Sequence, residues 1–237
     1  MDQLQTTPQS AFTAATAVSA ERVTAFLRKV YGWMFVGLGI TATVALGVAG
    51  SPTLVQAIAA NRILFFALAI GELGLVFYLS ARVNKLAPAT AAALFVVYSA
   101  LNGILFSFIF LVYSGTSIAT TFFVTAGMFG AMAVYGTTTK TSLAGWGSFL
   151  FMGLIGVVLA SIVGIFWQND TMQFVIAIVG VIVFTGLTAY DSQRLKAMAL
   201  ALPEGQTGSY AVSGALSLYL DFINLFLSLL RLMGNRR

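Results

Sequence analysis

Seven apolar segments, each close to the length that crosses a bilayer, constrain this chain more than any other feature. They cover residues 31–50, 62–80, 89–113, 117–135, 143–167, 172–190 and 211–230. About 20 helical residues span the roughly 30 Å of hydrocarbon in a bilayer. The pattern therefore predicts an all-α integral membrane protein with seven transmembrane helices.

The composition excludes a soluble globule and several kinds of site. Only 8% of the 237 residues are charged, and a soluble domain carries about three times that fraction. The chain has no Cys and no His, which excludes disulfides, Cys/His metal sites and a Ser-His-Asp triad. The net charge of +5 comes from residues scattered among loops and termini, which is typical of membrane flanks and not of nucleic-acid binding.

The N-terminal region predicts a tail and an entry into the first span. Residues 1–20 are rich in Thr, Ala, Ser and Gln, so we expect a flexible tail followed by one transmembrane domain over residues 21–237. Residues 20–30 have apolar side chains at helical spacing. They form either a helix on the membrane surface or a run-in to the first span.

Basic residues indicate the orientation. With a cytoplasmic N-terminus, the outer loops hold only Arg62, and the other basic residues before the last span lie on the cytoplasmic side, as the positive-inside rule requires. Arg231, Arg236 and Arg237 would then lie outside, against the rule. The last segment either crosses fully or re-enters, and its length and lack of a central breaker favour a full span.

Small residues recur at four-residue spacing in two segments, as Gly127 and Ala131 and as Gly156, Ala160 and Gly164. Such spacing lets helices approach closely in lipid. We expect these residues to pack within the bundle.

Asp221 lies in the middle of the last segment, where a carboxylate costs roughly 2.5–3.5 kcal/mol on insertion scales. Such a group is tolerated mainly when it faces the protein interior or a wet cavity. Helical spacing places it on one stripe with Gly214, Ser217, Asn224, Ser228 and Arg231. We expect this stripe to face inward, either for transport or only for hydrogen bonds between helices.

Asp191 ends the sixth segment, on the side from which the seventh begins. The two carboxylates could meet if the seventh helix starts below the interface or the sixth carries Asp191 into the membrane. Their titrations would then be coupled, so that the pair shares a proton at lower pH and repels at higher pH. In the alternative, Asp191 is interfacial and pairs with Arg194 or Lys196.

Two more charged residues belong to the second segment. Arg82 ends it on the cytoplasmic side and either reaches inward to an aspartate or forms an ordinary basic flank. Glu72 lies at its centre, between Gly71 and Gly74. Because a central glutamate needs a partner or a proton, we interpret Glu72 as a further interior polar site.

Residues 217–227, Ser-Leu-Tyr-Leu-Asp-Phe-Ile-Asn-Leu-Phe-Leu, resemble the C-terminal signature of the Bax inhibitor-1 (transmembrane Bax inhibitor motif) family. Residues 188–193, Thr-Ala-Tyr-Asp-Ser-Gln, resemble its sixth-helix motif. The hydropathy pattern matches over roughly residues 20–237, and the compact size is similar to the bacterial branch. The resemblance implies a bacterial inner-membrane protein whose central C-terminal helix is wrapped by the other six.

The resemblance also implies a pH-sensitive calcium leak gated by the paired aspartates Asp191 and Asp221. Arg82 would help to hold the closed state, although residues 81–85 read Ala-Arg-Val-Asn-Lys where some relatives have a denser basic run. Tight calcium sites use six to eight oxygen ligands. With so few carboxylates, we expect weak, transient calcium binding at the pair during permeation and no tightly bound cofactor.

Two other functions compete with the leak. Some bacterial relatives are linked to a membrane-bound AAA quality-control protease, so the chain could be its membrane-embedded regulator, with the tail as a handle. An intramembrane aspartyl protease would place its second Asp in Gly-x-Gly-Asp, whereas Asp221 follows Leu-Tyr-Leu. We therefore expect no enzyme, and partners that are lipid, calcium ions and protons.

Overall fold

The computed structural model describes residues 8–82, 85–167, 169–203 and 207–236. Within them, seven helical stretches are long and apolar enough to cross a membrane, which confirms the predicted helical membrane protein. The helices are α1 (Pro8–Ala49), α2 (Pro52–Ala60), α3 (Arg62–Arg82), α4 (Pro88–Phe106), α5 (Ile109–Val112), α6 (Gly115–Thr138), α7 (Ala144–Phe166), α8 (Asp170–Ala201) and α9 (Thr207–Met233).

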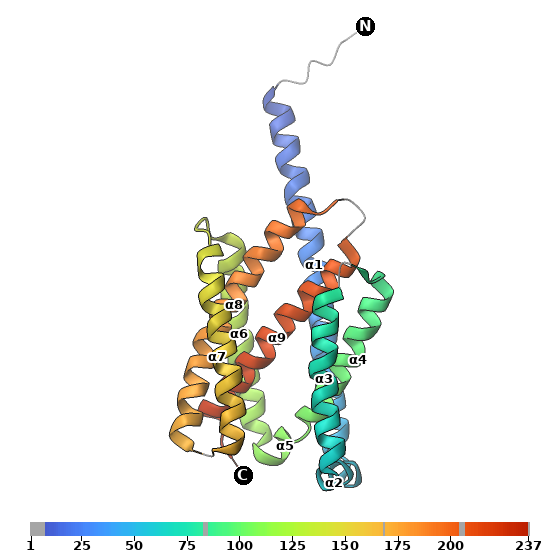
Figure 1. Ribbon diagram of the computed structural model, residues 1–237. Helices are drawn as coiled ribbons and strands as arrows, with labels where there is room; N and C mark the ends of the chain where they lie inside the picture. The colour runs from blue at the N-terminus through green and yellow to red at the C-terminus, as the bar shows by residue number, and fades with distance from the viewer. Residues whose placement is uncertain (1–7, 83–84, 168, 204–206, 237) are drawn as a thin grey trace.

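The last helix, α9, forms the centre of the bundle. It crosses obliquely behind α3 and α7 (Figure 1) and packs against α1, α4, α6 and α8. The other two spans form an outer layer, because α3 packs mainly on α4 and α7 on α8. Since α9 is enclosed on most sides, its apolar residues are buried as thoroughly as its polar stripe.

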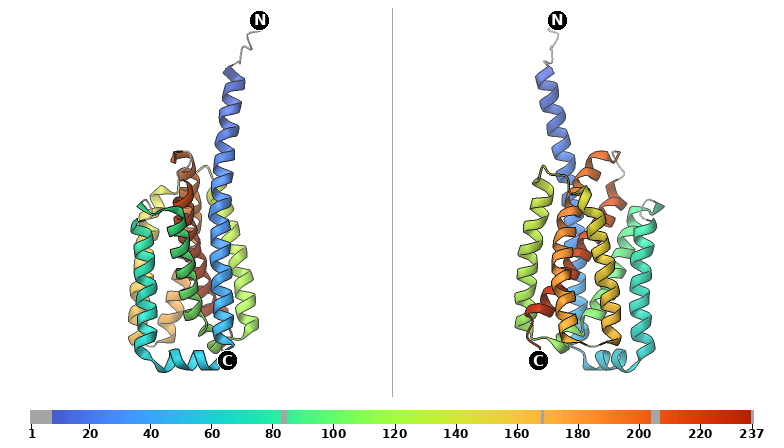
Figure 2. Two further views of the ribbon diagram at one scale, coloured as in Figure 1. Left: turned by 90° about the vertical axis from the view of Figure 1, so that its right-hand side faces the viewer. Right: turned by 60° about the vertical axis from the view of Figure 1, so that its left-hand side comes forward.

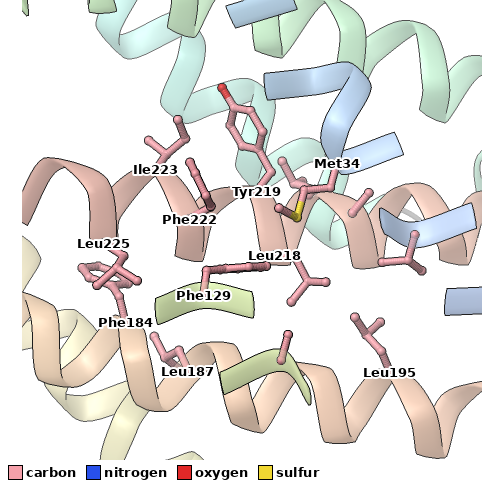
Figure 3. Close-up of a cluster of buried hydrophobic side chains, with 14 of the residues drawn as sticks. Met34, Phe129, Phe184, Leu187, Leu195, Leu218, Tyr219, Phe222, Ile223 and Leu225 are labelled. Atoms are coloured by element: carbon pink, nitrogen blue, oxygen red, sulfur yellow. The ribbon is translucent and has the colours of Figure 1, made fainter. Parts of the chain in front are cut away.

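The core lies between α9 and its neighbours. Leu218, Tyr219, Phe222 and Leu225 of α9 meet Met34 of α1, Phe129 of α6, and Phe184, Leu187 and Leu195 of α8 (Figure 3). All of these side chains are buried. Because neighbouring helices contribute to the same cluster, the depth and rotation of α9 are fixed on several sides at once.

The N-terminal region is helical earlier than expected. Residues 1–7 of the predicted tail lie outside the described residues, but α1 begins at Pro8 and continues without a break to Ala49. A proline at the first helical position followed by an alanine-rich sequence favours a helix. Residues 20–30 are therefore a run-in to the first span, and α1 extends beyond the rest of the bundle (Figure 2).

The expected packing of the small residues is wrong at two positions. A Cβ added at Gly127 or Gly156 would meet nothing within 4 Å, so these glycines do not mediate close helix contacts within the bundle. The tight approaches occur elsewhere: a Cβ at Gly136 of α6 would overlap the Ala189 carbonyl of α8, and one at Gly103 of α4 would lie 2.7 Å from the Thr41 carbonyl oxygen of α1. Spacing alone did not identify which side of a helix faces a neighbour.

We predict that Gly136→Ala lowers the melting temperature of the purified protein, because α6 and α8 must separate to admit the methyl group. The expected cost is about 1–3 kcal/mol. Gly127→Ala on the same helix is the matched control and should be neutral or slightly stabilising, since alanine has the higher helix propensity. Equal melting temperatures for the two variants would contradict the close α6–α8 contact.

Candidate functional site

The structure shows why Asp191 lies within the bundle and not at its end. Asp191 lies ten residues before Ala201, the end of α8, so α8 continues about 15 Å beyond it. Asp221 lies fourteen residues after Thr207, the start of α9, which corresponds to about 21 Å. The sixth span thus carries Asp191 into the bundle.

The two aspartates lie on neighbouring helices, and their surroundings differ. Asp221 is 5% exposed, and its Oδ2 has no hydrogen-bond partner among the described residues. The Asp191 side chain is 14% exposed, and its Oδ1 lies 4.0 Å from Nη1 of Arg194. The two side chains come from helices that pack against each other, and the meeting of their carboxyl groups stays a prediction.

A small cavity reaches the outer member of the pair. It has a volume of about 30 Å³ and is lined by Asp191, Arg194, Leu195, Met198, Ser213, Gly214 and Ser217. This volume can hold a water molecule. Asp191 therefore contacts a polar hollow between α8 and α9, whereas Asp221 lies deeper and does not line it.

Aromatic packing closes the bundle next to Asp221. The adjacent Phe222 meets Phe122 and Phe129 of α6 edge to face, each at a ring-centroid separation of 5.5 Å. This geometry is the preferred one for aromatic pairs. These ring contacts fix the side of α9 next to Asp221 against α6.

Arg194, and not Arg82, is the basic residue beside the pair. Arg82 is exposed at the end of α3, and no hydrogen bond or ion pair joins it to another residue in the described ranges. The Arg194 side chain is 60% exposed, so its ion pair with Asp191 contributes little. Lys196 donates instead to the Thr137 carbonyl at the end of α6, at 2.6 Å.

Glu72 belongs to a separate polar cluster near α9. Nδ2 of Asn102 on α4 donates to Oε1 of Glu72 at 2.7 Å and to the Tyr98 hydroxyl at 3.4 Å. The Tyr98 ring meets the Tyr219 ring edge to face, at a centroid separation of 5.8 Å. The Tyr219 and Thr41 hydroxyls lie 2.6 Å apart, so the cluster links α3, α4, α9 and α1 two residues from Asp221.

The other predicted polar residues of α9 do not bridge helices. Asn224 donates to the Leu220 carbonyl and Ser228 to the Asn224 carbonyl, at 2.8 and 2.7 Å, so each bonds its own helix. Ser217 lines the small cavity beside Asp191. Sequence reasoning missed Tyr98 and Asn102, although two polar residues four positions apart in an apolar segment are a usable signal.

Comparison with known proteins places these features in a family. The family model described as "Inhibitor of apoptosis-promoting Bax1" matches residues 23–237. The chain belongs to the Bax inhibitor-1 family. This Bax inhibitor-1 family match includes both aspartates, most of the first candidate span and all of the other six.

Several relatives of this Bax inhibitor-1 family member are bacterial. The inner membrane protein YbhL of Escherichia coli is 50% identical over 90% of this chain and 92% of its own length. An uncharacterized protein of Borreliella burgdorferi is 46% identical over 90% of this chain and 92% of its own. An uncharacterized protein of Deinococcus radiodurans is 41% identical over 92% of this chain and 93% of its own length. The chain is thus a multi-pass membrane protein of this family.

We predict that the Glu72–Asn102 contact couples strongly in stability measurements. Asn102→Leu leaves the Glu72 carboxyl group without its amide donor, and Glu72→Leu leaves the amide only its longer contact with Tyr98. Each should cost about 1–3 kcal/mol of unfolding free energy. The double Leu variant should cost less than the sum, because both polar groups are then gone. Additive losses in denaturant titrations of the detergent-solubilised protein would contradict the contact.

Proposed function

We propose that this protein is a passive, pH-sensitive calcium pathway gated by Asp191 and Asp221. The observation that carries the proposal is the position of two aspartates on the packed helices α8 and α9, with Asp221 buried and its Oδ2 without a hydrogen-bond partner among the described residues. A buried pair of like charges without a strong basic partner responds to protons more than to any other solute.

The pair can act as a switch because its two charge states have opposite effects on the α8–α9 contact. With one shared proton, a hydrogen bond links the helices. With both groups ionised, the charges repel in a medium where water does not screen them fully. The free energy of this helix contact therefore depends on pH without any histidine.

Weak coordination at the pair suits an ion that passes through. No group of three or more acidic, His or Cys side chains in the described part of the chain could hold a metal ion. Calcium takes six to eight oxygen ligands when it is held tightly. Two carboxylates and the Ser213 and Ser217 hydroxyls near the cavity supply fewer, so an ion that enters can also leave.

The cavity opens toward the end of the bundle from which α1 extends, and we propose that this end is cytoplasmic. Arg22, Arg28, Lys29, Arg194 and Lys196 gather there. Arg22 donates to the carbonyl of Leu202, the C-cap of α8, at 2.6 Å. Such pairing of cations with helix C-termini and the positive-inside rule support the same orientation.

We predict that Asp191→Asn and Asp221→Asn each remove the pH dependence of calcium flux into liposomes that contain the purified protein. Either substitution leaves a single carboxyl group, so the pair no longer exists. Glu21→Gln changes an exposed acid on α1 by the same chemistry and should keep the wild-type pH profile. Wild-type pH profiles in both aspartate variants would refute the gate.

A second candidate function rests on the N-terminal extension of α1. A helix that protrudes beyond the bundle (Figure 1) offers a handle for a membrane-bound AAA protease, which the protein would regulate. Under this proposal the pure protein carries no calcium in liposomes and co-purifies with such a protease.

Removal of residues 1–17 should abolish co-purification with the protease and leave calcium flux in liposomes at zero. Calcium flux by the pure protein would favour the first proposal.

A further inference from the structure

A second charged hollow lies at the end of the bundle where the chain finishes. It has a volume of about 320 Å³ and is lined by Tyr113, Asp170, Gln173, Phe174, Arg231 and Arg236. Asp170 begins α8, whereas Asp191 lies near its other end. The hollow is therefore remote from the aspartate pair and plays no part in the proposed gate.

Backbone contacts hold one of its arginines in place. The chain turns after α9 at Gly234, where a Cβ would lie 2.7 Å from the Tyr113 ring. Asn235 then accepts from the Ser114 amide at 3.2 Å and donates to the Ser117 hydroxyl at 2.9 Å. Arg236 pairs with Tyr113 in an antiparallel bridge, so it is fixed beside the hollow.

The charges in this hollow are not neutralised by ion pairs. Arg231 and Arg236 are exposed, and across the described ranges neither guanidinium has a carboxylate within 4.0 Å, although Asp170 lines the same hollow. Two arginines outweigh this one acid. A guanidinium fork matches the oxygens of a phosphate group, and Tyr113, which lines the same hollow, carries a further hydroxyl donor.

An apolar track leads from the hollow along the lipid-facing side of α8. Phe174, Ile178 and Ile182 are 55%, 39% and 63% exposed, and their four-residue spacing places them on one helix face. Phe174 also lines the hollow. A molecule with an anionic head and an apolar chain would match both surfaces.

We propose that this hollow binds the phosphate group of an anionic phospholipid, with Arg231 and Arg236 on the phosphate and an acyl chain along Phe174, Ile178 and Ile182. The positive-inside rule disfavours arginines at this end of the bundle. A phosphate-binding site gives a reason for their presence. A free phosphate ester shares the head chemistry but would not use the apolar track.

Native mass spectrometry of the full-length protein in detergent tests the proposal, with phosphatidylglycerol, phosphatidylcholine and inorganic phosphate as probes. We expect one phosphatidylglycerol to bind in preference to phosphatidylcholine. The Arg231→Gln/Arg236→Gln double variant should bind it about tenfold more weakly, as expected for loss of charge-assisted hydrogen bonds. Arg62→Gln, at the start of α3 on the same end of the bundle (Figure 1), should bind it as wild type does.

Four results would overturn the proposal. Unchanged phosphatidylglycerol binding by the double variant, or equal binding of phosphatidylcholine, would exclude a phosphate site at these arginines. If inorganic phosphate competes fully with phosphatidylglycerol, and Ile178→Ser binds phosphatidylglycerol as wild type does, the ligand is a soluble phosphate and not a lipid. Asp170→Asn should tighten phosphatidylglycerol binding, because it removes the negative charge from the hollow. A lower melting temperature of this variant without tighter binding would show that Asp170 is itself the partner of the arginines.

Discussion

The contact between α8 and α9 is the interaction on which the rest of the structure depends. It brings together the two helices that carry Asp191 and Asp221, inside a bundle whose other helices offer these aspartates no ion pair among the described residues. Isolated charges there would be costly, so the surrounding packing must hold the helices together against that cost. Gly136 and Ala189 bring α6 tightly against α8 two residues before Asp191, and Phe222 anchors α9 against α6.

The polar groups of the bundle form two clusters that meet on α9. Asp221 belongs to the cluster with Asp191, and Tyr219, two residues earlier, belongs to the cluster that includes Glu72, Asn102 and Thr41. A rotation of α9 would disturb both clusters at once. This arrangement gives the central helix a means of linking a change of charge at Asp221 to the packing of α1, α3 and α4.

Much of the fold could be predicted from the sequence because lipid imposes simple rules on length and polarity. The seven spans followed from apolar segments of bilayer length, and the importance of Asp221 followed from the cost of a charge among Leu and Phe residues. The depth and direction of individual side chains depended on how each helix is rotated and where it ends. Continuation of α8 to Ala201 decided the depth of Asp191, and the outward position of Gly127 could not be distinguished from an inward one by spacing. Arg82 shows the same limit, because the sequence does not tell whether a basic residue at a helix end points to the aspartates or to solvent.

Infrared difference spectroscopy of the reconstituted protein during a pH titration tests the central claim most directly, because it detects protonated carboxyl groups. A pair that shares one proton should titrate in two separated steps. The account predicts that Asp191→Asn and Asp221→Asn each convert the two steps into a single step at a new pH, because each group sets the titration of the other. Two independent steps, with each variant losing one and leaving the other unmoved, would contradict it.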